Sequence, residues 1–175
     1  MQANKSNVFF DGAGFKAEQL AATQFKGQLV TDLNQQYKDI DVLIKAKDGS
    51  TKSVSVKDQL WSSEKFGSIQ VELNTINTRT GVSQKGCFYT NESDYYFWRI
   101  WTKEHGDTWA VIESSVLKDF VKQNMDTLKP WSTTAKTEEK NRSYGRRYDR
   151  TTGVVLKTSD IAALGKLIPV KGTKQ

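Results

Sequence analysis

The sequence has little of two residue types that many common sites require. Its 175 residues include one cysteine, Cys87, and one histidine, His105. A single cysteine cannot form an internal disulfide, which favours a reducing compartment. A single histidine argues against a Ser-His-Asp triad and against a histidine-based zinc site. The phosphate-binding pattern G-x-x-x-x-G-K-[ST] is also absent from the sequence.

Long hydrophobic runs are absent as well. No apolar stretch approaches the roughly 20 residues that a membrane helix requires, so we expect no membrane association. The first residues are not followed by an apolar segment, so we expect no signal peptide. Together with the lone cysteine, these absences predict a soluble protein of the cytoplasm, or of the host cell cytoplasm if the protein is viral.

Positive charge is concentrated at one end of the chain. Residues 131–175 hold ten Lys or Arg and four Asp or Glu, which accounts for the whole net charge of +6. A one-sided basic segment indicates a polyanionic partner, although a solvated tail is the simpler interpretation. Arginines bind phosphates and tyrosines stack on bases. We therefore expect DNA contacts from residues in which the two types alternate, namely Arg142, Tyr144, Arg146, Arg147 and Arg150.

The spacing of apolar residues predicts helices and strands in alternation. Helical spacing is found over residues 15–30, between Ser115 and Pro130, and over 160–166. Period-two alternation and β-branched residues predict strands over 39–46, 51–58, 68–73, 94–102, 108–113 and 153–156. Polar composition predicts connections over 59–67 and 74–86.

This order of elements predicts an α/β fold, with one domain and a central mixed β-sheet flanked by helices. A chain of this length fits one domain. We divide it into a core over residues 1–130 and a basic C-terminal extension over 131–175 that packs on the core.

Charged side chains gather on the predicted hairpin and on the elements around it. They are Glu18 on the first helix, Asp41 on the first strand, Lys57 at the end of the second strand and Glu72 on the third. Ser55 and Lys57 are two residues apart, as are Asp39 and Asp41, so each pair shares a face. Carboxylates bind Mg²⁺, which activates water and neutralises developing charge in phosphodiester hydrolysis. A neighbouring lysine can orient the water and the phosphate.

This layout resembles the PD-(D/E)xK, or restriction-endonuclease-like, nuclease superfamily of phage and bacterial type. The matching pieces are Glu18, Asp41-Val42-Leu43-Ile44, Asp48-Gly49, Ser55-Val56-Lys57, Gly67-Ser68-Ile69-Gln70-Val71-Glu72 and Asp94-Tyr95-Tyr96. The resemblance covers about residues 12–125. It implies Mg²⁺-dependent cleavage of DNA, or Mn²⁺ in place of Mg²⁺. It also implies that Asp41 is the central metal ligand, Lys57 the water- and phosphate-orienting base, and Glu18 the outer acid.

Ser55 departs from the family pattern, because members usually carry Glu, Asp or Gln at this position. A serine hydroxyl is a weaker metal ligand than a carboxylate. The resemblance implies that an acid from farther along the chain replaces it, and we expect Glu72, ahead of Glu64, to share the metal with Asp41.

Two other functions stay open. A nuclease fold with an inactive site would be a module that binds DNA or a protein partner. A structural or assembly protein of a virus is the third option. A restriction-type cut of both strands would require either a homodimer, for which the sequence gives no signal, or two successive passes.

Overall fold

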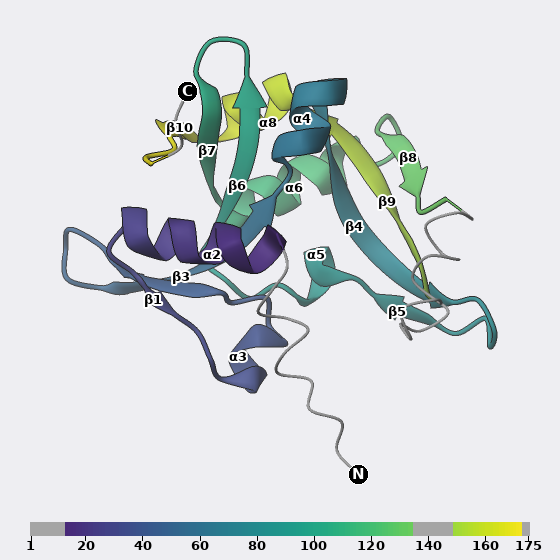
Figure 1. Cartoon of the computed structure of the whole chain (residues 1–175). Coiled ribbons are helices and arrows are strands. Elements are labelled where there is room, and N and C mark those ends of the chain that lie inside the picture. The colour runs from purple at the N-terminus through teal and green to yellow at the C-terminus, as the bar shows by residue number, and fades with distance from the viewer. Residues whose placement is uncertain (1–12, 135–148, 173–175) are drawn as a thin grey trace.

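Two β-sheets form the frame of the molecule (Figure 1). The structure is a computed structural model that describes residues 13–134 and 149–172. The larger sheet contains, in spatial order, β1 (Gln28–Leu29), β2 (Val42–Lys45), β3 (Thr51–Asp58), β6 (Tyr95–Thr102), β7 (Gly106–Glu113) and β10 (Lys166–Pro169). The smaller sheet contains β5 (Ser83–Lys85), β4 (Ser68–Asn77), β9 (Asp149–Lys157) and β8 (Lys129–Ser132). Strands β3 and β6 run parallel, and the other described pairs run antiparallel.

Helices cover both faces of the larger sheet (Figure 1). They are α2 (Ala13–Gln24), α3 (Leu33–Gln36), α4 (Leu60–Phe66), α5 (Cys87–Thr90), α6 (Ser114–Asn124) and α8 (Thr158–Leu164). Helix α2 packs on β2 and β3. Its sheet-facing residues include Ala17 and Ala21, whose small side chains allow the helix to approach the sheet closely.

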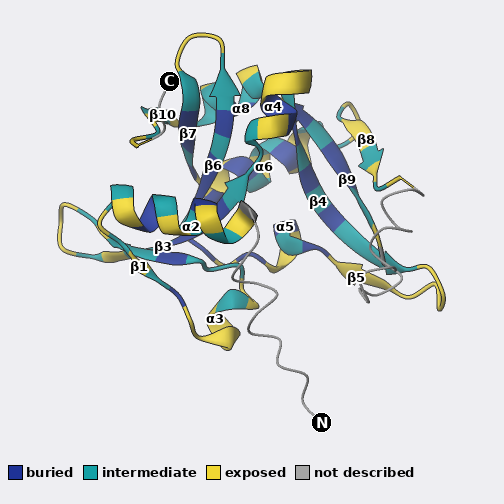
Figure 2. Ribbon diagram, viewed as in Figure 1, coloured by how far each residue is buried: buried dark blue, intermediate teal, exposed yellow. Residues whose placement is uncertain are grey.

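Strand β6 lies inside the larger sheet and carries apolar side chains on both faces. Tyr96, Trp98 and Ile100 join one core with residues of α6, α8 and the smaller sheet. Phe97 points the other way and joins the core beneath α2. A strand buried on both faces requires a nearly continuous apolar run, which explains the aromatic composition of β6. Figure 2 shows this strand in dark blue and teal, the colours of buried and intermediate residues.

The hairpin of β2 and β3 places the acidic residues next to Lys57. Its turn contains Gly49, whose φ of 82° lies in the left-handed region that glycine adopts most readily. The strands pair with Val42 opposite Val54. Pairing continues one residue before β2, because the Asp41 N–H donates to the Val54 carbonyl at 2.9 Å. Asp41 is therefore held beside the last residues of β3.

The predicted fold class is confirmed: the domain is α/β, and helices flank a central mixed sheet. The strand expected over 51–58 has these bounds, and the segments expected at 94–102 and 108–113 form the β6–β7 hairpin. The expectation of one sheet is wrong. Strand β4 pairs with β5 and β9 and does not pair with the β2–β3 hairpin.

The reason for the second sheet lies in residues 59–67, which the sequence predicted to be a connection. This segment contains α4, which leads the chain from β3 to another sheet. Its buried serines satisfy their hydroxyls locally, since Ser63 Oγ donates to the Gln59 carbonyl at 2.7 Å and accepts from the Trp101 N–H at 2.8 Å. The buried face of this helix can therefore consist of serines.

The described part of the C-terminal segment belongs to both sheets. Strand β9 lies between β4 and β8, and β10 forms an edge of the larger sheet beside β7. Arg150 lies on β9 and is exposed, whereas Arg142, Tyr144, Arg146 and Arg147 lie outside the described residues.

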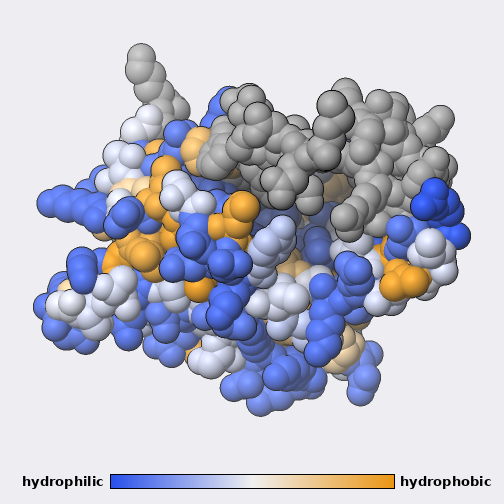
Figure 3. Space-filling model, turned by 90° about the horizontal axis from the view of Figure 1, so that it is seen from below, coloured by the Kyte–Doolittle hydropathy of each residue, from blue (hydrophilic) through white to orange (hydrophobic). Residues whose placement is uncertain are grey.

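The surface seen from below is largely hydrophilic, with hydrophobic residues in limited groups (Figure 3). Most apolar side chains contribute to the two cores instead. Within residues 13–134 and 149–172, no helix combines the length and the apolar character needed to span a membrane.

Candidate functional site

Lys57, at the end of β3, is the centre of a cluster of charged side chains. Its ammonium group forms an ion pair with Asp39. The hydroxyl of Ser55, two residues earlier on the same face, donates to the other Asp39 oxygen at 2.8 Å. Both side chains of the Ser55-x-Lys57 pattern therefore converge on one carboxylate.

Asp39 is held in an uncommon backbone conformation. Its φ is 59°, in the left-handed region, which Asp and Asn enter more readily than other non-glycine residues. The Nδ2 of Asn91, a buried residue at the end of α5, donates to the Asp39 carboxylate at 3.2 Å. Asn91 in turn donates to Ser93 Oγ at 2.9 Å. This network fixes the carboxylate that receives Ser55 and Lys57.

Asp41 follows Asp39 by two residues, and a hydrogen bond also holds its carboxylate. Its Oδ2 accepts from the Val56 N–H at 2.7 Å. Burial raises the pKa of Asp41 to about 6, and the negative charge of Asp39 adds to this effect. The Lys57 ammonium and the Val56 N–H act in the opposite direction but do not cancel the increase.

Glu18 reaches the cluster from α2. Partial burial raises the pKa of Glu18 to about 7, and the charges of Asp41 and Asp39 raise it further, while Lys57 lowers it. These couplings show that the helix acid and the hairpin acids share one environment. Two carboxyl groups with pKa values near neutrality are unusual and are typical of functional sites, although structural networks also produce them.

Lys57 remains charged at neutral pH. Removal from water is the largest influence and lowers its pKa, but the carboxylates of Asp39 and Asp41 raise it and dominate in combination with the other contacts. A protonated ammonium cannot accept a proton. The geometry therefore suits Lys57 to orient a phosphate or water by its charge.

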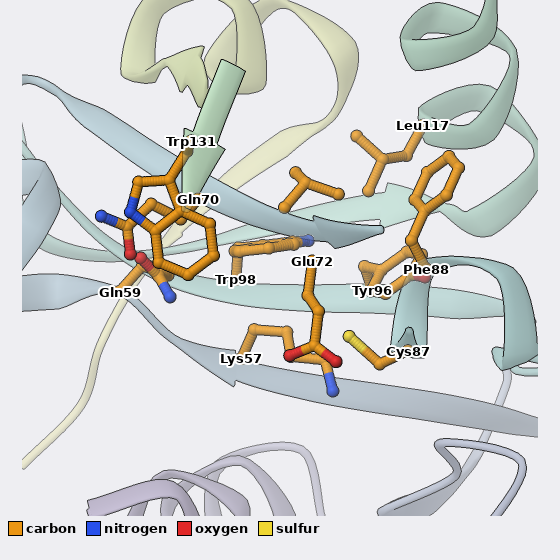
Figure 4. A pocket seen from close by; sticks show the side chains of 11 residues that line it. Lys57, Gln59, Gln70, Glu72, Cys87, Phe88, Tyr96, Trp98, Leu117 and Trp131 are labelled. Carbon is orange, nitrogen blue, oxygen red and sulfur yellow. The ribbon is translucent and has the colours of Figure 1, made fainter. Parts of the chain in front are cut away.

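A cleft also adjoins Lys57. It has a volume of about 320 Å³ and is lined by Lys57, Gln59, Gln70, Val71, Glu72, Cys87, Phe88, Tyr96, Trp98, Leu117 and Trp131. In Figure 4 the Glu72 carboxylate lies beside the end of the Lys57 side chain, both point the same way, and the Cys87 sulfur lies next to them. Burial raises the pKa of the Cys87 thiol to about 12, so the thiol stays protonated and is a poor nucleophile.

Of the predicted site residues, Glu18, Asp41, Ser55 and Lys57 come together. Glu72 does not join the carboxylates as expected on the strand next to Lys57, because β4 belongs to the smaller sheet. It lines the cleft together with Lys57 instead, and its Oε1 accepts from Thr75 Oγ1 at 3.2 Å. A register shift between Glu72 and Asn74 marks a bulge at this point of β4.

Glu18 and Asp41 are the carboxyl groups of this cluster that could hold a metal ion. Burial raises the pKa of both, with a further increase from Asp41 at Glu18 and from Asp39 at Asp41, and a bound cation would oppose these increases. Within the described part of the chain, no three His, Cys, Asp or Glu side chains are close enough to enclose a metal ion. Mg²⁺ does not require such a cage, since it is usually held by one or two carboxylates, waters and substrate phosphates.

Two residues of this site escape sequence reasoning. Asp39 was noted for sharing a face with Asp41, but nothing indicated that it would receive Lys57. Asn91 carried no signal, because it is 52 positions from Asp39 and follows a short helix in a segment for which no element was predicted. The two-residue spacing in Asp39-x-Asp41 and Ser55-x-Lys57 was the one available hint.

Comparisons with known proteins supply a distant match. No protein-family model matches the sequence, and no curated protein matches it. Among solved structures, the chain is similar to a bacterial homing endonuclease at 21% sequence identity and a TM-score of 0.42. The match covers 65% of this chain and 73% of the endonuclease. Similarity at this level does not assign an activity, which must be inferred from the side chains of the site.

Proposed function

We propose that this protein is a restriction-endonuclease-like nuclease that hydrolyses DNA phosphodiester bonds in a Mg²⁺-dependent reaction. The observation that carries the proposal is one charged lysine that is paired with Asp39 and lies within electrostatic reach of Asp41 and Glu18. Three acids and a cation at the open end of a hairpin fit the demands of phosphoryl transfer, which are metal binding and neutralisation of negative charge.

Each residue has a defined part in this proposal. Asp41 and Glu18 would hold the metal, because their carboxyl groups are the two with raised pKa values. Bound Mg²⁺ supplies a water of lowered pKa and a positive charge at the phosphate. Lys57 orients the scissile phosphate through its ammonium group. Asp39 is a positioning residue, since it fixes Lys57 and Ser55 in one geometry.

A cleavage assay tests this proposal. Supercoiled, linear, branched and single-stranded DNA are incubated with the protein in Mg²⁺, in Mn²⁺ and in EDTA. We expect cleavage that requires the metal and that Asp41→Asn reduces by at least about 10²-fold. Asp119→Asn, at an exposed position of α6, is the matched control and should retain full activity.

Two outcomes would contradict the proposal. Cleavage that persists in Asp41→Asn would place the reaction elsewhere. Absence of cleavage on every DNA, with the protein folded, would leave the inactive DNA- or protein-binding module as the remaining interpretation.

A further inference from the structure

The cleft beside Lys57 has the size of a small-ligand site and has no part in the reaction described above. Its volume of about 320 Å³ lies at the lower end of the range for small-molecule pockets, about 300–1,000 Å³. It lies where β3 and β6 of the larger sheet meet β4 and β8 of the smaller one. The side chains that line the cleft therefore indicate which class of ligand it binds.

The walls are largely aromatic. Trp98 and Tyr96 line the interior from β6, and Trp131 lines the outer part from β8. Trp131 and Glu72 both pair with Gly153 of β9, so the three positions form one row across the smaller sheet. A side chain at position 153 would collide with the backbone, because its Cβ would lie 1.9 Å from the Val71 oxygen. Glycine at this position thus allows β9 to approach the β4 backbone closely beside the cleft.

The interior contains polar groups that the described chain leaves unsatisfied. Tyr96 and Trp98 are 2% and 3% exposed, and neither the Tyr96 hydroxyl nor the Trp98 Nε1 has a hydrogen-bond partner among the described residues. Buried polar groups without partners are rare and destabilising. Both side chains line the cleft, so a ligand with its own donors and acceptors would satisfy them.

Two carboxamides add further hydrogen-bonding capacity at the Trp131 end. Figure 4 shows Gln59 and Gln70 gathered beside the Trp131 ring. Gln59 is oriented, since its Oε1 accepts from Ser62 Oγ at 2.7 Å. A carboxamide offers a donor and an acceptor side by side, which matches the edge of a nucleobase.

The charges of the lining residues favour a nucleobase over a phosphate as the group that enters the cleft. Lys57 and Glu72 carry opposite charges and both line the cleft. The Glu72 carboxylate would repel a phosphate within the cleft, while the aromatic walls favour a flat, uncharged ring. A phosphate would remain at Lys57, toward the acidic cluster.

We propose that the cleft receives one nucleobase rotated out of the DNA stack, with the adjoining phosphate at Lys57. The inference rests on the proposed function, because it takes DNA as the substrate. Trp131 stacks on the base, and Gln70, Gln59 and the Trp98 N–H bind its edges. Extrusion is easiest where a base is mismatched.

DNA binding in EDTA tests this inference without cleavage. The dissociation constant is measured for one short duplex that is fully paired and for the same duplex with a single mismatch. We expect the wild-type protein to bind the mismatched duplex about tenfold more tightly, because less base pairing is lost. Trp131→Ala and Gln70→Leu should each abolish this preference, because both side chains bind the extruded base, and circular dichroism verifies that the variants fold.

Matched controls are available on the surface. Trp61→Ala removes an exposed tryptophan of α4, and Gln84→Leu changes an exposed glutamine of β5. Both should retain the mismatch preference. Equal affinities of the wild type for both duplexes, or a preference that survives in Trp131→Ala and Gln70→Leu, would overturn the base site.

The outcome is separable from that of the cleavage assay. Cleavage without a mismatch preference would overturn the base site and retain the nuclease proposal. A mismatch preference that depends on Trp131 and Gln70, without cleavage on any DNA, would retain the base site and overturn the nuclease proposal.

Discussion

Two regions adjoin Lys57, the acidic cluster on the β2–β3 hairpin and the cleft, and they differ in how their polar groups are satisfied. On the hairpin side, Asp39 accepts from Ser55, Asn91 and Lys57, and Asp41 accepts from the Val56 N–H. On the cleft side, the Tyr96 hydroxyl and the Trp98 N–H have no partner in the described chain. The first side is electrostatically organised before any ligand binds, whereas the second offers unused hydrogen-bonding capacity.

This difference separates two tasks. Preorganised charges stabilise a transition state because they need no rearrangement when the reaction occurs. Unsatisfied groups between aromatic walls suit recognition, since a ligand gains the bonds that the protein lacks. Lys57 borders both regions. We therefore expect substitutions on the hairpin side to affect turnover and those on the cleft side to affect binding.

Removal of Lys57 should have the largest effect, because it is the cation shared by both sides. We expect Lys57→Ala to lower kcat/KM for DNA cleavage by about 10³-fold, the size observed when a transition-state donor is removed. Lys52→Ala is the control, because Lys52 lies on the same strand but on the opposite face. Steady-state kinetics measure the effect, and circular dichroism verifies the fold. A loss of less than tenfold would place Lys57 outside the reaction.

Sequence patterns predicted the features that depend on residues close together in the chain. The β2–β3 and β6–β7 hairpins follow from alternation and from turns a few residues long. Asp41, Ser55 and Lys57 were therefore placed together correctly, since one hairpin holds all three. The helix acid Glu18 also reached them, because α2 has one hydrophobic face to cover β2 and β3.

The parts that depend on distant pairing were not predictable in the same way. Glu72 was expected beside Asp41 because β4 follows β3 in sequence, but β4 pairs with β9, about 80 residues later. Local periodicity specifies that a strand exists and which face is apolar, not which strand it joins. The role of Asp39 likewise depends on a left-handed backbone and on Asn91, neither of which the spacing of residues specifies.

Removing the charge of Asp39 should lower the unfolding free energy by an intermediate amount. Asn fits the volume and the left-handed backbone, so Asp39→Asn removes chiefly the ion pair with Lys57. Breaking a buried pair costs about 3–5 kcal/mol. The two side chains are 22% and 14% exposed, so we expect a loss of about 2 kcal/mol in unfolding free energy. Urea unfolding measures it, with Asp119→Asn as the control, and an unchanged midpoint would contradict the assigned role.

The acids on the hairpin side should make the unfolding free energy of the wild-type protein depend on pH. The pKa values of Glu18 and Asp41 are about 7 and 6 in the folded protein, above the ordinary values of 4.5 and 3.8. Between these limits the folded state binds more protons than the unfolded state, so the unfolding free energy falls as pH rises. Glu18→Gln should make this slope shallower.

Urea unfolding across this pH range measures the slope. Glu64→Gln, at an exposed position on α4, is the control and should leave the slope unchanged. A slope of the same size in Glu18→Gln and in the wild type would show that Glu18 does not titrate in this window.

The smallest expected effect is the most direct test of the contrast, because it compares two buried hydroxyls at paired positions. Ser55 on β3 and Tyr96 on β6 are register partners and are 0% and 2% exposed. The Ser55 hydroxyl donates to Asp39, whereas the Tyr96 hydroxyl has no partner in the described chain. Removing a satisfied hydroxyl costs about 1 kcal/mol, while removing an unsatisfied one is neutral or stabilising.

We therefore expect Ser55→Ala to lower the unfolding free energy by about 1 kcal/mol and Tyr96→Phe to leave it unchanged or raise it slightly. Urea unfolding of both variants without DNA measures the difference. For the affinity toward mismatched DNA we expect the opposite order. Tyr96→Phe should weaken binding more than Ser55→Ala, because it removes a group that faces the base. Equal losses of stability in the two variants would show that the Tyr96 hydroxyl is satisfied in the free protein, and the two sides of Lys57 would then not differ in this respect.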